Sequence, residues 1–411
     1  MQINPAECNR EDGLASNVIN QAIKTCSQSG GGVVEISAGT YTCGTLHMQN
    51  GVLLELKAGA RLVGTDQVEA YDAFISPNRV KHEPQNDRWH RAMILFQDVE
   101  DAGIVGPGII DGADVRDAEG EEKMRGPHTI LAGNSRQLVF ESFRVESSAN
   151  YAFLVEYCDN LEFRDLKIHG GWDGIHIRGN RDKDCERITI QACDFQTGDD
   201  SIAGRYWRDM LISRCDINSS CNGIRVIGPA KELTVVDCHF RGPGRHPHIT
   251  QGRTNALAGI LLQPGSWDDT QGDLDEVFLT RNSFANLECP LATLLKPGNR
   301  SGRIVVDGLT ATGIYGNALS FESWAEDPLD QVVLRNVSVD FTSDAVRQSL
   351  PPEEAPELGV RDLPAWGLYA KHIRRLWIDN VRMYIDGEDA RPLYTSTQVE
   401  ELLSSHAPPH L

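Results

Sequence analysis

Short apolar runs recur along the chain at nearly regular intervals. Each run is three to five residues long, and turn-forming Gly, Asn and Asp lie between the runs, a pattern typical of short β-strands. From residue 138 onward the runs start at Leu138, Leu161, Ile188, Met210, Leu233, Val277, Ile304, Val332 and Leu376. The steps between successive starts are 23, 27, 22, 23, 44, 27, 28 and 44 residues. Each step of 44 fits either one coil with an insertion or two coils, one of them poorly matched.

A parallel β-helix explains this period. Like strands of successive coils then stack into parallel sheets, about 4.8 Å apart, so residues one repeat apart become side-by-side neighbours. No helical pattern separates the runs, which disfavours a βα horseshoe or an α/β barrel, and a propeller blade would need about 40 residues for its four strands. Because each coil contacts only its neighbours, we expect a single all-β domain over residues 1–411.

Three segments depart from the repeat. Helical spacing of apolar residues between positions 14 and 26, followed by Gly30–Gly32, predicts one helix within residues 14–29. We expect this helix to cap the first coil, because the open end of a repeat array exposes its core. The Pro- and Glu-rich stretch 345–365 predicts a solvated loop insertion. Residues 399–411 predict a loosely held C-terminal tail with a short helix at most.

Charge and composition narrow the function classes. The formal net charge of −20 argues against nucleic acid and anionic membrane surfaces as partners, since both attract basic proteins. The chain has no apolar run of about 18 residues that would predict a transmembrane helix. Its first residues lack the basic and apolar regions of a signal peptide. We therefore expect a cytoplasmic protein, or a secreted or periplasmic one if a leader has been removed. A homo-oligomer is compatible with the sequence.

The ten cysteines do not follow a disulfide or metal pattern. Cys193, Cys215 and Cys238 lie at one phase of the repeat, 22 and 23 residues apart. A stacked ladder of small buried side chains would produce this recurrence, because free Cys packs as a small hydrophobe. There is no Cys-x-x-Cys pair. The sequence thus predicts reduced, structural cysteines.

The chemistry is expected between residues 171 and 265. Four segments there share a small residue followed by isoleucine, at Ile175, Ile202, Ile224 and Ile260. Repeat phase then places Asp173, Asp200 and Asn222 in one column and Asp199 in the neighbouring one. Buried carboxylates without basic partners are costly, so we expect the aspartates at a corner before the strands, facing a groove. Mutual repulsion would favour a proton on one carboxyl, and a protonated carboxyl beside ionised ones suits glycoside hydrolysis. A plain Gly-Asp-Asp turn is the structural alternative.

Other residues in or near these columns are candidates for substrate binding. They are polar or aromatic side chains that could hydrogen-bond to a sugar or stack on it: His176, Arg178, Arg205, Asn222, Arg225, Gln263, Trp267, Lys296, Glu322 and Trp324. The two tryptophans could equally pack beneath loops. His239, His246 and His248 lack the fixed ligand spacing of a metal site and predict a polar loop. The sequence predicts neither a metal nor a cofactor.

At these residues the chain resembles glycoside hydrolase family 28, the polygalacturonase-like enzymes, over nearly its whole length. The stretch GGGVVEISAGTYTCGTLHMQNGVLLELKAGARLVGT and the stretch GIVGPGIIDG resemble that family's first coils. GWDGIHI resembles its Asn-Thr-Asp-Gly-Ile segment, and TGDDSIA resembles its Gly-Asp-Asp segment. The resemblance implies a right-handed parallel β-helix of the pectate-lyase-like kind and inverting hydrolysis of a carbohydrate. It also implies that Asp199 is the general acid and that Asp173 and Asp200 hold the attacking water.

Three segments differ from the family's pattern. The Gly-His-Gly segment is Cys221–Gly223 here, so the expected histidine is Asn222. The Arg-Ile-Lys segment, which holds the substrate carboxylate, corresponds to Leu261–Gln263, and the Asn-Thr of the first motif is Gly171–Trp172. These changes favour a neutral or differently linked sugar over polygalacturonan, unless Arg178, Arg205 and Arg225 build a different clamp.

Two other functions fit the same pattern. A β-helix lyase, epimerase or intramolecular glycosyl transferase would need a base near a uronate C5, and Arg225 keeps that hypothesis open. A carbohydrate-binding β-helix without chemistry would need the aspartates only for folding.

Overall fold

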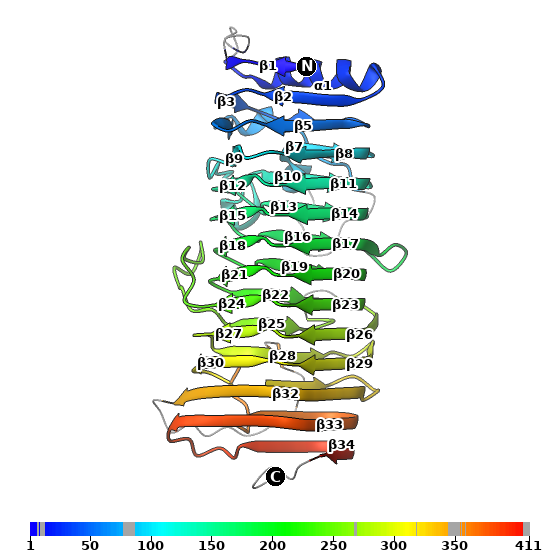
Figure 1. Ribbon diagram of the computed structural model, residues 1–411, viewed down its shortest axis with the longest axis vertical. Helices are drawn as coiled ribbons and strands as arrows, with labels where there is room; N and C mark the ends of the chain where they lie inside the picture. Colours follow the sequence, from blue (N-terminus) through cyan, green and yellow to red (C-terminus); the bar gives the residue numbers. More distant parts are fainter. Residues whose placement is uncertain are drawn as a thin grey trace. The chain divides into compact units, whose positions relative to one another are not determined.

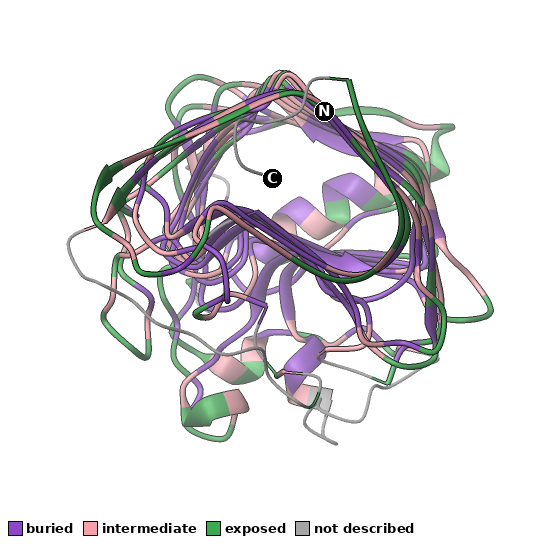
Figure 2. Ribbon diagram, turned by 90° about the horizontal axis from the view of Figure 1, so that it is seen from below, coloured by how far each residue is buried: buried purple, intermediate pink, exposed green. Residues whose placement is uncertain are grey.

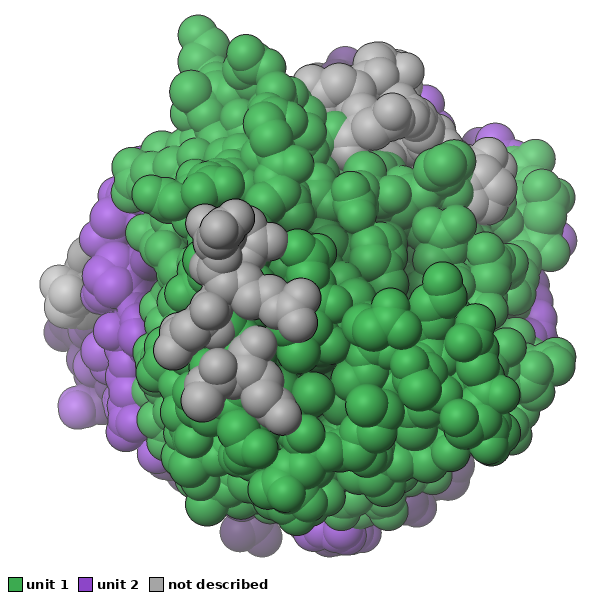
Figure 3. Space-filling model, turned by 90° about the horizontal axis from the view of Figure 1, so that it is seen from above, with its two compact units in different colours: residues 1–199 green, residues 200–411 purple. Residues whose placement is uncertain are grey.

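The computed structural model describes residues 1–5, 8, 13–76, 87–266, 269–317, 319–343, 354, 356–357 and 359–405. Contacts between Cα atoms divide the chain into two compact units, residues 1–199 and residues 200–411, which are coloured separately in Figure 3. Each unit is built from stacked parallel strands. The expectation of one continuous domain stays a prediction.

Unit 1 consists of three parallel sheets and a few short helices (Figure 1). The first sheet contains β1 (Gln2–Ile3), β2 (Gly32–Ile36), β5 (Val52–Leu56), β8 (Glu100–Val105), β11 (Arg136–Glu141), β14 (Asp159–Arg164) and β17 (Cys185–Gln191). The second contains β3 (Gly39–Cys43), β6 (Ala60–Gly64), β9 (Ile109–Asp111), β12 (Arg144–Glu146), β15 (Lys167–His169) and β18 (Asp194–Thr197). The third contains β4 (Leu46–His47), β7 (Ala92–Gln97), β10 (His128–Gly133), β13 (Phe153–Glu156) and β16 (Ile175–Arg178). The helices are α1 (Ser16–Gln28), η2 (Val68–Ala70), η3 (Asp87–His90) and η4 (Glu121–Lys123).

Unit 2 repeats the same plan. One sheet contains β20 (Trp207–Ser213), β23 (Ala230–Val236), β26 (Gly272–Thr280) and β29 (Asn299–Asp307). The next contains β21 (Asp216–Ser219), β24 (His239–Arg241), β27 (Ser283–Ala285) and β30 (Thr310–Ile314). The third contains β19 (Ile202–Arg205), β22 (Asn222–Val226), β25 (Ala258–Leu262), β28 (Cys289–Leu295) and β31 (Leu319–Ser323). The long strands β32 (Leu329–Ser343) and β33 (Leu368–Gly387) each pair along more than one sheet, and β34 (Tyr394–Ser404) pairs with β33.

The predicted register is confirmed within each unit. In unit 1, Leu138 pairs with Leu161, which pairs with Ile188. In unit 2 the column runs through Met210, Leu233, Val277, Ile304, Val332 and Leu376. Leu233 is the direct neighbour of Val277, and Val332 is the direct neighbour of Leu376. Each step of 44 residues is therefore one coil with an insertion.

The core lies inside the coils, where every second strand residue points. Phe140 and Phe163, one coil apart, are fully buried and stack with ring centroids 5.0 Å apart. Figure 2 shows buried positions (purple) along the stacked strands. All ten cysteines are buried thiols that are not in disulfides, as predicted. Burial raises the pKa of the Cys289 thiol to about 12, so it stays protonated at neutral pH.

The predicted cap helix is α1. Its buried face, which includes Ile19, Ala22 and Ile23, packs against β2, β4 and β5. The helix ends where Gly30 and Gly31 take positive φ angles, and the Gly31 amide donates to the carbonyl of Cys26 at 3.0 Å. Among the described residues, none of the helices is both long and apolar enough to span a bilayer.

For the residues that can be checked, one prediction about the C-terminal part was wrong, and the predicted loop insertion is irregular as expected but not fully solvated. Residues 399–404 belong to β34 and not to a loose tail, because Val399 and Leu402 take the register positions next to Ile373 and Leu376. Within the predicted solvated insertion 345–365, Leu363 is buried against Tyr369. Residues 344–353, 355, 358 and 406–411 lie outside the described residues.

The cysteine ladder makes a direct prediction. All ten thiols should react with a thiol reagent after unfolding in denaturant without reductant. In the native protein they should react slowly, because all are buried. A titration of fewer than ten thiols in the unfolded protein would show that some are bridged.

Candidate active site

Asp173 lies in the turn before β16, as predicted, but it is not exposed to a groove. Its side chain is only 6% exposed, and its Oδ2 lies 2.6 Å from Nδ1 of His176. The expectation that the aspartates avoid burial was wrong for Asp173 and Asp200, each of which is 4% exposed when the whole residue is counted. The reason is that each has a basic partner, which lowers the cost of burying its charge.

An aromatic ring covers one face of the His176 imidazole. Tyr151 stacks on the imidazole with centroids 4.7 Å apart and planes 4° apart. Burial, and then the charge of Asp173, raise the pKa of the Tyr151 hydroxyl, so it stays neutral. His176 is thus held between a ring on its face and a carboxylate on its edge.

Asp199 lies beside Trp172, the residue that precedes Asp173 in the sequence. Its backbone amide donates to the carbonyl of Trp172 at 3.3 Å, which confirms the predicted neighbouring column for these two residues. Asp199 is half-buried, and is thus more exposed than Asp173. The two aspartates of unit 1 therefore come from adjacent coils.

Arg125 supplies a positive charge next to Asp199. Its guanidinium lies over the ring of Trp172, 3.7 Å from the centroid. Burial lowers the pKa of Arg125, but the negative charges of Glu121 and Asp199 and the neighbouring Tyr151 raise it above its usual value. The sequence analysis missed Arg125, because it lies on an irregular connection after η4 that has no repeat partner.

Arg178 is buried among other residues of unit 1. Its Nε lies 3.6 Å from Oε1 of Glu156, and its guanidinium lies 4.3 Å from the centroid of Trp89. His90 contacts the same Glu156 oxygen at 3.4 Å. The rings of His90 and His128 both pack edge-on against Trp89. Sequence reasoning missed these three aromatic neighbours, of which Trp89 and His90 lie in η3, before β7, and His128 begins β10.

In unit 2, Asp200 is held by the strand one coil later. Its Oδ1 accepts hydrogen bonds from the Asn222 side chain at 2.7 Å and from the Asn222 backbone amide at 3.2 Å. Its Oδ2 lies 3.5 Å from Nη1 of Arg225. The predicted column of Asp200 and Asn222 is confirmed, as is the pairing of Ile202 with Ile224 and of Ile224 with Ile260. Arg205, at the end of β19, is buried.

Leu261 and Gln263 occupy the positions of the expected basic pair and contact the chain itself. Leu261 belongs to a buried apolar cluster against which Val360 packs. Gln263 is 1% exposed, and its Nε2 donates to the backbone carbonyl of Glu357 at 3.0 Å. Lys296 Nζ lies 4.0 Å from a carboxylate oxygen of Glu357.

Glu322 lies in β31 of unit 2, and Trp324 follows directly after that strand. Glu322 is fully buried and accepts two hydrogen bonds from Arg361, at 3.0 and 2.6 Å. Trp324 donates from Nε1 to Glu322, and Lys371 lies over its ring. Trp267 lies outside the described residues.

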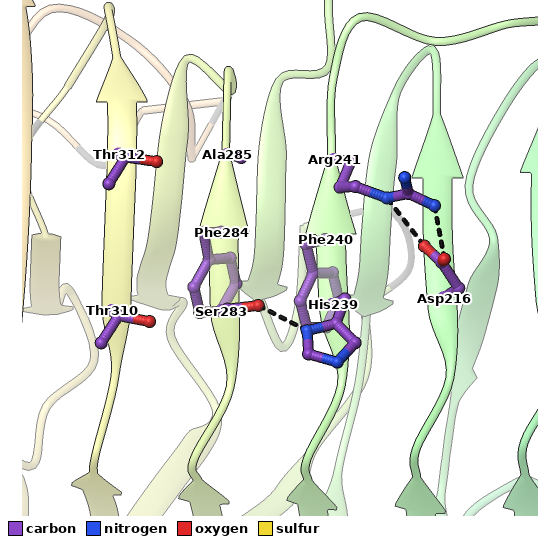
Figure 4. A pocket seen from close by; sticks show the side chains of 9 residues that line it. All are labelled: Asp216, His239, Phe240, Arg241, Ser283, Phe284, Ala285, Thr310 and Thr312. Carbon is purple, nitrogen blue, oxygen red and sulfur yellow. Dashed lines mark hydrogen bonds and ion pairs between the residues drawn. The ribbon is translucent and has the colours of Figure 1, made fainter.

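A different sheet of unit 2 carries an open groove of about 420 Å³ (Figure 4). In this groove His239 contacts Ser283 at 2.6 Å, and Arg241 forms a forked ion pair with Asp216. Phe240 and Phe284 stack beneath it and point inward. Apart from His239, none of the residues singled out from the sequence lines this groove.

Comparisons with known proteins agree with this fold. Residues 128–266 match the family model described as a right handed beta helix region. A polygalacturonase from Chamaecyparis obtusa is 20% identical over 286 residues, which are 64% of this chain and 54% of that relative. The chain thus spans about half the length of this curated relative.

Solved structures share the architecture at low identity. A hyperthermoactive exopolygalacturonase from Thermotoga maritima is 16% identical, with a TM-score of 0.63 over 93% of this chain and 92% of that one. PfbA, a surface adhesin of Streptococcus pneumoniae, is 15% identical, with a TM-score of 0.51 over 98% of this chain and 93% of that one. Together with the confirmed register, these findings show that the chain has the right-handed parallel β-helix fold, which it shares with polygalacturonases.

Proposed function

We propose that the protein is a glycoside hydrolase that cleaves a glycosidic bond in an oligosaccharide or polysaccharide. The observation that supports this most is the pair of buried aspartates, Asp173 and Asp200, each held by a specific partner at a position that matches a polygalacturonase motif. Burying a carboxylate is costly, and such groups concentrate at functional sites.

The proposed roles follow from exposure and hydrogen bonding. Asp199 is the least buried of the three aspartates and serves as the general acid, giving its proton to the glycosidic oxygen. Asp173 and Asp200 serve as acceptors that orient a water molecule and take its proton. The water then attacks the anomeric carbon from the face opposite the leaving group, which inverts the configuration.

Neighbouring residues keep these groups in place. His176 and Tyr151 orient Asp173, and Asn222 with Arg225 orients Asp200. Arg125 stabilises the carboxylate that forms on Asp199 once the proton has left. No metal or cofactor takes part in this scheme.

The substrate is proposed to differ from polygalacturonan. Leu261 and Gln263 carry no charge and are buried. Arg178 is buried too, beside Glu156 and Trp89. A neutral or differently linked sugar fits these surroundings better than a run of uronates.

A catalytically inactive saccharide-binding protein is the second candidate, since a surface adhesin has the same architecture. A lyase or epimerase that uses Arg225 as a base is the third. A lyase would form an unsaturated product that absorbs ultraviolet light, whereas a hydrolase would not.

Substituting the aspartates tests the catalytic roles. Asp199→Asn should lower kcat on natural oligosaccharides by at least ~10²-fold, the usual contribution of a general acid. It should have a smaller effect on aryl glycosides, whose leaving groups need little protonation. Asp173→Asn and Asp200→Asn should impair both substrates alike.

The control for these variants is Asp216→Asn, which changes an exposed aspartate of unit 2 that pairs with Arg241. This variant should keep full activity. Near-normal activity of folded Asp199→Asn on a natural substrate would contradict the assignment and favour the lyase or binding candidates.

The stereochemistry of the product tests the mechanism. Proton NMR at early times should detect the anomer opposite to that of the substrate linkage, because water attacks directly and no covalent intermediate forms. Initial formation of the same anomer would show that an aspartate acts as a nucleophile.

The prediction about substrate specificity follows from the uncharged residues Leu261 and Gln263, which stand where the motif has a basic pair. Reducing-end assays should show that polygalacturonate is hydrolysed weakly or not at all, while at least one other plant polysaccharide is cleaved. Efficient release of galacturonate would show that other arginines bind the carboxylate.

A further inference from the structure

Part of the insertion between β32 and β33 lies across the outer face of the sheet that carries Arg225. We define the covering segment as Glu357 together with residues 359–361. Val360 packs on a patch of small and apolar side chains, formed by Ala258, Leu261, Cys289 and Ala292. The backbone of Gly359 lies so close to Leu261 that a Cβ atom added to Gly359 would be 2.5 Å from Cδ1 of Leu261. The covering segment therefore leaves no space over β25 at this point.

The covering segment is anchored at both ends. At one end its Glu357 carbonyl accepts the hydrogen bond from Gln263. At the other end Arg361 forms the forked ion pair with Glu322, whose side chain is fully buried and also accepts a hydrogen bond from Trp324. Beyond Arg361, Leu363 is buried against Tyr369. Separating Arg361 from Glu322 would leave the buried carboxylate without its charged partner, which is costly, so this pair and the apolar contacts hold the covering segment against the sheet.

The covering segment begins one strand away from the residues that hold Asp200. Asn222 and Arg225 lie on β22, and Arg225 pairs in register with Leu261 on β25. Adjacent strands are about 4.8 Å apart, which is close to the length of one sugar ring. Asp200 precedes β19, so β25 is two strand spacings away from it, and a sugar chain that crosses the strands from Asp200 in this direction meets the covering segment after about two sugar units.

We propose that the covering segment closes one side of the sugar-binding surface, so that the enzyme releases short products from a chain end. Leu261 and Gln263 determine this specificity by holding the covering segment, and they do not bind sugar. Glu322 and Trp324 are positioning residues that anchor Arg361. This inference rests on the proposed hydrolase function.

The product pattern of the wild-type protein is the first test. It should be measured on a defined series of linear oligosaccharides and on the parent polymer of whichever polysaccharide is cleaved. One short product of constant size should appear from the earliest times, and the viscosity of the polymer should fall little for each reducing end formed. A ladder of intermediate lengths at early times would overturn the inference and leave the hydrolase function intact. Absence of hydrolysis on every substrate would instead overturn the proposed function, and the inference with it.

The second test releases the covering segment. Because Arg361→Ala alone would leave Glu322 buried without its partner, the variant to make is Glu322→Gln with Arg361→Ala. With this variant, the viscosity of the polymer should fall several-fold more for each new reducing end, and intermediate oligosaccharides should appear. The matched control is Asp307→Asn with Arg335→Ala, which removes an exposed forked pair in the same unit and should keep the wild-type pattern. If the first double variant does not fold, Val360→Ser weakens only the packing on the apolar patch of β25 and β28 and should shift the pattern in the same direction. An unchanged pattern in a folded variant would show that the covering segment does not set the product size.

Discussion

The in-register stacking of parallel strands is the constraint on which the rest of this structure depends. Each residue of a coil lies beside its counterpart one coil later, about 4.8 Å away. The same rule that stacks Leu233 on Val277 in the core places Asn222 beside Asp200 on the outside. It also explains why long insertions are tolerated, since the strands before and after an insertion are already neighbours and the added loop costs only slowly growing closure entropy. Functional groups can thus be added between coils without disturbing the ladder.

The sequence predicted those features that repeat with the coils. Backbone turns follow the same intervals as the apolar runs, with positive φ angles at Ser142, Asp165, Ala192, Arg214, Asp237 and Arg281. Residues that precede a strand of the repeat, such as Asp173 and Asp200, could be assigned to a column for the same reason. The last strand was missed because Glu400 and Glu401 interrupt the apolar alternation. Only its register with β33 shows that Leu402 continues the column of Leu376.

Residues on the connections between coils could not be predicted in this way. Arg125, Trp89 and His90 have no counterpart one repeat away, so their spacing contains no information about where they fold. Their effect on the candidate site is nonetheless large. Arg125 brings a positive charge to Asp199, and Trp89 with His90 encloses Arg178 and Glu156. The burial of Asp173 and Asp200 was misjudged for a related reason. Their partners His176 and Arg225 were visible in the sequence, but the contacts that join each pair depend on side-chain directions at the corner before a strand.

The uncharged residues at positions 261 and 263 can be understood from the covering segment. The Leu261 side chain lies among Ala258, Cys289, Ala292 and Val360, none of which carries an acidic group. An arginine at this position would bring an unpaired charge into an apolar contact, which is strongly unfavourable. At position 263 a lysine could still donate to the Glu357 carbonyl, but its charge would be buried near that of Lys296, which already lies 4.0 Å from the Glu357 carboxylate. Neutral side chains at both positions are therefore what the covering segment requires. The departure from the polygalacturonase motif at these positions and the packing of the covering segment on β25 are thus two aspects of one arrangement, and basic residues introduced here would not fit beneath the covering segment.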